Sequence, residues 1–194
     1  MKIFFALLFL LASLSQLSVA AEKESSEEEI SEKRQSFTLA VLPDTQFYCD
    51  TRLKLSNKWG NGDLRRYFFD QTRWVRDNQK RLNIAFLVHE GDIVQADAPE
   101  EWAIAKKAMS ILDGHVPYCL CLGNHDMGFQ KSNNKYGGDI AVNRTTHFNK
   151  YFPREKFAKT KEFGGTFDPK RHDNSWYHFA AAGMKFLIVS LECK

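Results

Sequence analysis

The sequence predicts an α/β fold, and three observations support this prediction. Short apolar, β-rich runs alternate with segments of helical periodicity in the order strand, helix, strand, helix, strand. Such alternation favours a parallel sheet with helical cover. Each of the three expected strands also ends at a loop that carries a polar side chain suited to binding. Ligands gather at the carboxyl ends of parallel strands, so these loop tips are the first place to look for a site.

The first expected strand runs from Phe37 to Leu42, where Pro43 stops it, and the second runs from Ile84 to Val88. Between them, Asp63 is expected to cap a helix that extends to about Arg81. The apolar residues of this helix lie near one stripe, which Trp74 widens: Leu64, Tyr67, Phe68, Val75 and Leu82.

A second helix is expected to begin at Asp97, whose side chain can cap the backbone while Glu100 completes a box-like pair. Gly114 ends this helix, and its apolar residues follow at helical spacing: Trp102, Ala105, Met109 and Leu112. The third strand, Pro117 to Leu122, then leads into the last of the three polar loops.

The remainder of the chain predicts a short helix from Thr145 to Tyr151. Two strands, Ser175 to Ala181 and Lys185 to Leu191, are expected to form a hairpin through Gly183. The polar stretches 50–62 and 131–138 read as loops at the rim of the molecule, where substrate selection commonly resides.

The amino-terminal residues predict a targeting segment followed by one domain. Residues 1–21 have the layout of a cleaved signal peptide, with Lys2, an apolar run from Ile3 to Leu11 and small residues up to Ala21. A membrane anchor is the alternative, but the apolar run is far shorter than the roughly 20 residues that span a bilayer. Residues 22–35 are Glu-rich, so a flexible acidic segment is expected there. Residues 36–194 are then expected to form a single domain, secreted or in the secretory-pathway lumen, without a membrane anchor.

The chain contains four cysteines, which in a secreted protein permit three disulfide connectivities. Cys119 and Cys121 alternate with leucines in an apolar run, so both are expected on one face of a buried strand, where bridging them is geometrically poor. Pairing of Cys49 with Cys193 stays open, as does glycosylation of the sequon at Asn143.

The three loop tips carry the chemistry. They are Asp44 with Gln46 after the first strand, Gly91-Asp92 after the second, and Gly123-Asn124-His125-Asp126 after the third. The third tip combines an oxygen ligand, an imidazole and a carboxylate, which metal-assisted hydrolysis requires. A single Gly-Asp pair is common in ordinary turns. Three such tips in order indicate a metal-dependent phosphoesterase.

These motifs resemble those of the calcineurin-like metallophosphoesterase superfamily. The superfamily has Asp-x-His at its first strand, Gly-Asp at its second, and Gly-Asn-His-Asp or Gly-Asn-His-Glu at its third. The resemblance covers roughly Phe37 to Leu191. It implies a metallophosphoesterase-like β-sandwich flanked by helices, here an amino-terminal portion that is incomplete at its carboxyl terminus.

The resemblance also implies a role for each residue. Asp44 and Gln46 would bind a first divalent metal ion, Asn124 a second, and Asp92 would bridge the two; the metals would be Mn, Fe, Zn or Mg. A hydroxide bridging the metals would attack phosphorus. His125 would stabilise the phosphoryl oxygens or protonate the leaving group, and Asp126 would hold the ring of His125 in orientation.

Two features depart from the superfamily pattern. Gln46 stands where the first motif usually has His, and an amide oxygen is a harder ligand than imidazole, which favours Mn²⁺ or Mg²⁺. The later histidine motifs of the superfamily have no match before Lys194, and His172 and His178 do not stand in a matching context.

The expected function is that of a secreted hydrolase of phosphomonoesters or phosphodiesters, acting on small molecules or phosphorylated substrates. The net charge of +3 is small, and aromatic residues are not interleaved with basic ones, so no nucleic-acid site is expected. Two alternatives stay open: a non-catalytic metal-binding protein of the same fold, and a secreted interaction module unrelated to metal.

Overall fold

The computed structural model describes residues 36–51, 56–57, 60–61, 63–127, 129–130, 135–136 and 145–192. The chain divides into two units, residues 1–36 and 37–194, and every element described below belongs to the second. The expected signal peptide, the acidic segment and the sequon at Asn143 lie outside the described residues.

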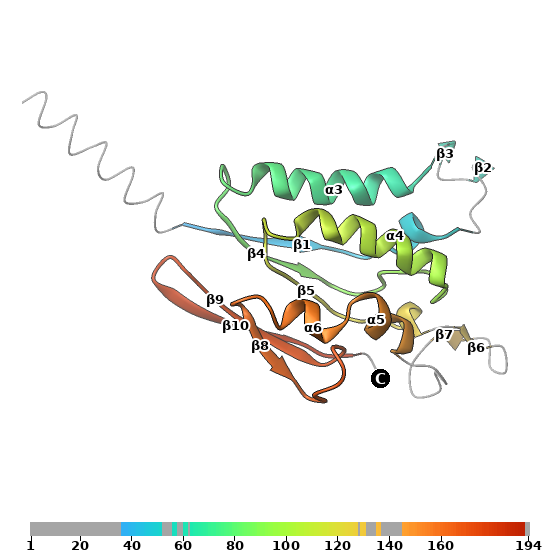
Figure 1. Ribbon diagram of the computed structural model, residues 1–194. Helices are drawn as coiled ribbons and strands as arrows, with labels where there is room; N and C mark the ends of the chain where they lie inside the picture. Colours follow the sequence, from blue (N-terminus) through green and yellow to red (C-terminus); the bar gives the residue numbers. More distant parts are fainter. Residues whose placement is uncertain are drawn as a thin grey trace, which may run out of the picture. The chain divides into compact units, whose positions relative to one another are not determined.

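A parallel sheet of three strands carries the first part of the unit (Figure 1). Its strands are β1 (Thr38–Leu42), β4 (Ile84–His89) and β5 (Tyr118–Leu120), in the order β1-β4-β5. Helix α3 (Arg65–Asn78) connects β1 to β4, and helix α4 (Pro99–Met109), continued by the turn η1 (Ser110–Leu112), connects β4 to β5. The predicted alternation of strands and helices is confirmed.

An antiparallel sheet of three strands follows, in the order β10-β9-β8. Strands β9 (Ser175–Ala181) and β10 (Met184–Ser190) form the predicted hairpin. Both of its turn residues are left-handed, with φ of 50° at Ala182 and 73° at Gly183, the conformation of a two-residue type I′ turn. Strand β8 (Phe163–Thr166) was not expected from the sequence.

The remaining elements are short. Helix α5 (Thr146–Tyr151) confirms the predicted helix after the Gly-rich loop, whereas α6 (Arg154–Phe157) was not expected. The others are α2 (Gln46–Cys49), η2 (His125–Met127), and the two-residue strands β2 (Ser56–Asn57), β3 (Gly60–Asn61), β6 (Phe129–Gln130) and β7 (Lys135–Tyr136).

Strand β4 is buried between helices on one face and the antiparallel sheet on the other. On one face, Phe86 stacks on Phe179 of β9 with ring centroids 5.2 Å apart and 12° between the planes. On the opposite face, the ring of His89 lies 6.0 Å from that of Phe68 on α3. Because alternate residues of a strand face opposite sides, this arrangement makes a sandwich of two sheets with helical cover. The predicted α/β fold class is confirmed.

The predicted start of the second helix is wrong. Pro99 opens α4, Ala98 occupies the N-cap position, and no side chain caps the helix. The Asp97 carboxylate instead accepts the indole N–H of Trp102, at 2.7 Å. Glu101, rather than Glu100, reaches back to accept the backbone N–H of Ala96, at 2.7 Å. The apolar positions of the helix are buried as predicted: Trp102, Ala105, Met109 and Leu112.

The first helix also differs in part from its prediction. Asp63 accepts the backbone N–H of Arg65, at 3.0 Å, although the N-cap position itself is Leu64. Phe68 and Val75 are buried, but Trp74 is 53% exposed and does not widen the buried stripe.

Cys49, Cys119 and Cys121 are free thiols, and Cys193 lies outside the described residues. Burial raises the pKa of the Cys119 thiol to about 12, which fits its role as a small apolar side chain. None of the helices in the described part of the chain is long and apolar enough to cross a membrane.

Candidate active site

The three polar tips meet at the carboxyl ends of the parallel strands, and Asp92 joins them. The backbone N–H of Thr45, in the first tip, donates to the carbonyl oxygen of Asp92 at 3.1 Å. The backbone N–H of His125, in the third tip, donates to Asp92 Oδ1 at 3.0 Å. Asp92 itself is left-handed, with φ of 47°, which is an uncommon conformation for a residue with a side chain. The convergence that the sequence predicted is therefore present for these tips.

Two glycines allow the second and third tips to approach so closely. A Cβ atom on Gly123 would lie 2.1 Å from Asp92 Oδ1 and 2.5 Å from the Asp92 backbone nitrogen. A Cβ atom on Gly91 would lie 2.8 Å from the backbone nitrogen of Gly123, and Gly91 has φ of 105°. Each glycine thus leaves space for the other tip, which explains physically why both motifs contain one.

Asp44 and Gln46 lie together in the first tip. Asp44 Oδ1 accepts the backbone N–H of Gln46 at 2.8 Å, and Asp44 Oδ2 accepts its side-chain amide N–H at 2.7 Å. The amide nitrogen therefore faces Asp44, which leaves Gln46 Oε1 buried and without a hydrogen-bond partner in the described part of the structure. A buried acceptor without a partner destabilises a fold by about 1–3 kcal/mol unless another group satisfies it.

Asp126 holds two loops together. Its carboxylate is fully buried and accepts the backbone N–H groups of Val94, at 2.8 Å, and Gly123, at 2.9 Å. Burial raises the pKa of Asp126 to about 8, and the hydrogen bonds from these two N–H groups oppose the rise.

The ring of His125 is oriented by a different group from the one the sequence suggested. Its Nδ1 lies 2.9 Å from the backbone carbonyl oxygen of Gln95, whereas Asp126 was expected to hold it. Both residues lie in the 3₁₀ turn η2, where successive side chains are rotated by about 120° around the axis. Neighbours in such a turn face different directions, so Asp126 turns into the core while His125 meets the loop after β4.

Two residues outside the predicted ligand set support the tips, Thr45 and His89. The hydroxyl of Thr45 donates to the carbonyl oxygen of Ile93 at 3.1 Å and lies 3.0 Å from His89 Nε2. The other ring nitrogen of His89 accepts the backbone N–H of Gly91 at 3.2 Å. The ring is completely buried, and this burial lowers the pKa of His89 to about 3, so the ring is neutral. The sequence feature that points to His89 is a histidine at the end of an apolar run that forms a strand.

Comparison with known proteins agrees with this geometry. The sequence profile of the calcineurin-like phosphoesterases matches residues 37–188. The chain belongs to this family. It is 33% identical over 147 residues to the uncharacterized protein YvnB of Bacillus subtilis (strain 168), a match that covers 75% of this chain and 10% of YvnB. The chain thus spans about a tenth of the length of this relative.

Among solved structures, the purple acid phosphatase PPD1 from yellow lupin (Lupinus luteus) seeds is similar, with a TM-score of 0.44 and 16% identity. The similarity covers 82% of this chain and 25% of the lupin chain.

Calcineurin-like phosphoesterases typically depend on two metal ions, so the predicted ligands can be tested for their fit to metal. Within the described residues, no three His, Cys, Asp or Glu side chains are grouped to hold a metal ion. The predicted set does not need such a group, because it consists of the carboxylates of Asp44 and Asp92 and the amides of Gln46 and Asn124. Its donors are all oxygen atoms, and the unpartnered Gln46 Oε1 is one of them. Oxygen donors suit hard divalent cations.

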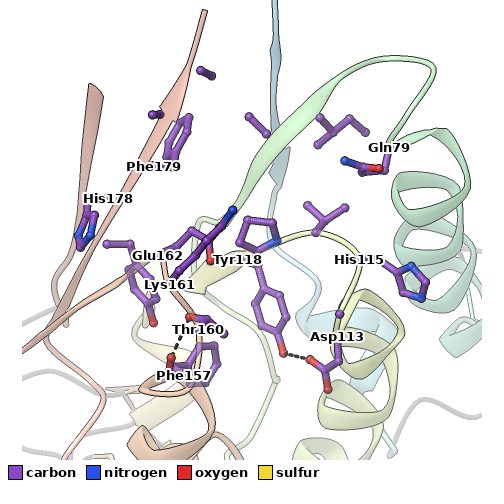
Figure 2. A pocket seen from close by; sticks show the side chains of 18 of the residues that line it. Gln79, Asp113, His115, Tyr118, Phe157, Thr160, Lys161, Glu162, His178 and Phe179 are labelled. Carbon is purple, nitrogen blue, oxygen red and sulfur yellow. Dashed lines mark hydrogen bonds and ion pairs between the residues drawn. The ribbon is translucent and has the colours of Figure 1, made fainter. Parts of the chain in front are cut away.

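A separate cavity of about 1180 Å³ lies away from these tips. It is lined by the first residues of β4 and β5, by the segment 113–117 that leads into β5, and by residues of α6 and β9 (Figure 2). Tyr118, Phe157 and Phe179 line it, and Tyr118 donates its hydroxyl proton to Asp113 at 3.0 Å. Because β4 and β5 run parallel, their first residues are at the end opposite the polar tips. This cavity is therefore not part of the candidate active site.

Proposed function

We propose that this chain provides the catalytic residues of a secreted, metal-dependent hydrolase of phosphomonoesters or phosphodiesters. The observation that carries the proposal is the position of Asp92, which bonds to both neighbouring tips through its carbonyl and carboxylate oxygens. Membership of the calcineurin-like phosphoesterases supports hydrolysis of phosphate esters as the reaction class.

The oxygen atoms of Asp44, Gln46, Asp92 and Asn124 would hold two divalent cations, which acidify water and neutralise phosphate charge when bound. The two carboxylates supply the negative charge of this set, and the buried amide oxygen of Gln46 supplies a donor that nothing else in the described structure satisfies. An oxygen-only set favours Mn²⁺ or Mg²⁺ over softer metals.

His125 would face the phosphoryl group. The backbone carbonyl oxygen of Gln95 can only accept a hydrogen bond, so its contact with the ring of His125 requires a proton on Nδ1. The other ring nitrogen, Nε2, would be the donor to a phosphoryl oxygen when it carries a proton. Asp126 keeps the two loops at the required separation through its bonds to Val94 and Gly123.

The test is hydrolysis of an aryl phosphate by the full chain after addition of Mn²⁺ or Mg²⁺, with bound metal measured in parallel. Asp92→Asn should lose both turnover and metal, because one side chain serves both cations. Asp70→Asn is the matched control, since Asp70 lies on α3 with its side chain 64% exposed. Turnover by Asp92→Asn at the rate of Asp70→Asn would refute the assignment.

A non-catalytic metal-binding protein is the second candidate. It is favoured by the composition of the ligand set, in which two of the four side chains, Gln46 and Asn124, are neutral amides. Stoichiometric metal without turnover in the same assay would support this candidate instead.

Secretion forms part of the proposal and rests on the layout of residues 1–21. Expression in a secreting host followed by amino-terminal sequencing should give a chain that begins after Ala20 or Ala21. An intact Met1 on the exported protein would refute cleavage.

A further inference from the structure

The loop that follows Asp92 anchors a second imidazole in addition to that of His125. His147, on α5, places its ring Nδ1 2.8 Å from the backbone carbonyl oxygen of Asp97 and 3.2 Å from Asp97 Oδ1. The ring of His125 bonds in the same way to the carbonyl of Gln95. The anchoring residues are two apart, so their Cα atoms are separated by at most about 7 Å. Two histidines from distant parts of the chain therefore bond to nearby positions of one loop.

The contact with a carbonyl oxygen determines which nitrogen of His147 carries the proton. Because the carbonyl of Asp97 can only accept, Nδ1 is the donor, and the neighbouring carboxylate oxygen shares that proton. Nε2 is then the nitrogen that gains or loses a proton during a reaction. The side chain of His147 is 29% exposed, which leaves it accessible from solvent.

The side chain of Asp97 is fixed by its contacts with neighbouring residues. Its carboxylate accepts the indole N–H of the fully buried Trp102 at 2.7 Å, and its side chain is 10% exposed. Its backbone is left-handed, with φ of 54°, as is that of Asp92 at the other end of the loop. Strained conformations of residues with side chains cluster at functional sites, where the surrounding contacts maintain them. A carboxylate beside an imidazole Nδ1, on a ring that is partly exposed, is an arrangement that supports proton transfer through Nε2.

We propose that His147, positioned by Asp97, is the group that protonates the leaving oxygen of the phosphate ester, while His125 binds the phosphoryl oxygens. This inference rests on the proposed function. In the reaction, a water oxygen forms a bond to phosphorus, the ester P–O bond breaks, and the proton that the attacking water loses passes to the solvent. The leaving oxygen keeps the electron pair of that bond and takes the proton from His147 Nε2. The ring of His147 is left neutral, with its remaining proton on Nδ1 in the hydrogen bond to Asp97. A proton from the solvent then returns to Nε2.

The leaving group distinguishes this role from a structural one. A nitrophenolate leaves without help from an acid, whereas an alkoxide requires a proton. His147→Asn in the full chain should therefore lower kcat on an alkyl phosphate by about 10²-fold or more, the usual contribution of a positioned acid. On nitrophenyl phosphate, the variant should match His115→Asn, a control at an exposed histidine beside the separate cavity. Equal losses on the two esters, or no loss on either, would overturn the proposal.

Asp97 is a positioning residue, and its test is a pH profile. Asp97→Asn keeps the backbone carbonyl and an oxygen for Trp102, but it removes the negative charge beside His147. With the alkyl ester as substrate, the descending limb of the plot of kcat against pH should move to lower pH. The reason is that the imidazolium of His147 no longer has the negative charge of Asp97 beside it. A limb that stays in place would show that Asp97 does not act on His147.

A binding measurement on the wild-type protein keeps the proposal testable if a variant does not fold. Inorganic phosphate added to the Mg²⁺-loaded chain should shift the ring proton signal of His147 in the NMR spectrum. An unmoved signal while phosphate binds would overturn the role of His147 and leave the proposed function standing. A wild-type chain that hydrolyses neither ester would instead refute the proposed function, and this inference with it.

Discussion

Replacing Gly123 by alanine tests the close approach of the second and third tips. The added Cβ atom would lie 2.1 Å from Asp92 Oδ1, 2.5 Å from the Asp92 backbone nitrogen and 2.6 Å from Asp92 Cγ. Contacts of a carbon atom with non-bonded atoms begin near 3.5 Å, so the tips must move apart by about 1 Å or more. Two of these atoms belong to the backbone or to the base of a short side chain, so a rotamer change alone cannot relieve the overlap.

The expected loss follows from what that movement breaks. The hydrogen bond from His125 N–H to Asp92 Oδ1 is 3.0 Å long, and a further 1 Å takes it beyond bonding distance. Losing a bond to a charged acceptor removes about 1.5–3 kcal/mol, and overpacking adds about 1–3 kcal/mol. Gly123→Ala should therefore lower the free energy of unfolding by about 3–5 kcal/mol, a large share of the stability of a typical domain.

Gly114→Ala is the control for this prediction. Gly114 has φ of 73°, and a Cβ atom there would meet nothing within 4 Å, so the substitution introduces backbone strain without a clash. Its expected loss is about 1–2 kcal/mol. Urea denaturation followed by tryptophan fluorescence measures both variants, and calorimetric titration with Mn²⁺ measures the site. If Gly123→Ala is as stable as Gly114→Ala and binds Mn²⁺ like the wild type, the close packing of the tips is not what maintains the site.

Three further substitutions test other parts of the structure. Asp126→Ala should lower stability by about 2–5 kcal/mol in urea denaturation, because the buried N–H groups of Val94 and Gly123 each lose their acceptor; a loss below 1 kcal/mol would contradict this. Burial lowers the pKa of His172 to about 4, against about 6.5 in an unfolded chain, so the unfolded chain binds the proton first as the pH falls. The free energy of unfolding should then drop by about 3 kcal/mol between about pH 6.5 and pH 4. Denaturation at several pH values measures this dependence, and His172→Gln should remove that part of it. An unchanged slope of the unfolding free energy against pH would be evidence against the buried neutral ring. Phe86→Ala should lower stability by about 3–5 kcal/mol because its fully buried ring packs between the two sheets, and a loss near that of an exposed residue would contradict the sandwich.

Elements with a clear apolar period could be predicted from the sequence. The three strands of the parallel sheet, helices α3 and α4 and the β9–β10 hairpin all lie within a few residues of their expected ranges. Burial drives their formation, and burial follows the spacing of apolar residues. Strand β8 was missed because its segment contains Gly164 and Gly165, which are poor strand formers. Trp176 fills the space above both glycines, so this strand forms through a tertiary contact that no local pattern shows.

The start of α4 shows the limit of local rules. Asp97 followed by Pro99 and acidic residues satisfies the pattern of a helix capped by Asp97, but the helix begins at Pro99 with Ala98 at its N-cap position. The Asp97 side chain instead contacts Trp102 and His147, and His147 lies on α5, 50 positions further along the chain. A carboxylate that can cap a helix can also accept other donors, and only the fold decides between them.

The contacts between the three tips also depend on the fold. The site residues could be listed from their motifs, but the motifs say nothing of how the tips bond to one another. Asp92 holds an uncommon backbone conformation because Thr45 and His125 bond to it, and Asp126 ties the loop after it to Gly123. The described structure forms all of these bonds from protein groups alone. These bonds between protein groups hold the three tips in their positions relative to one another.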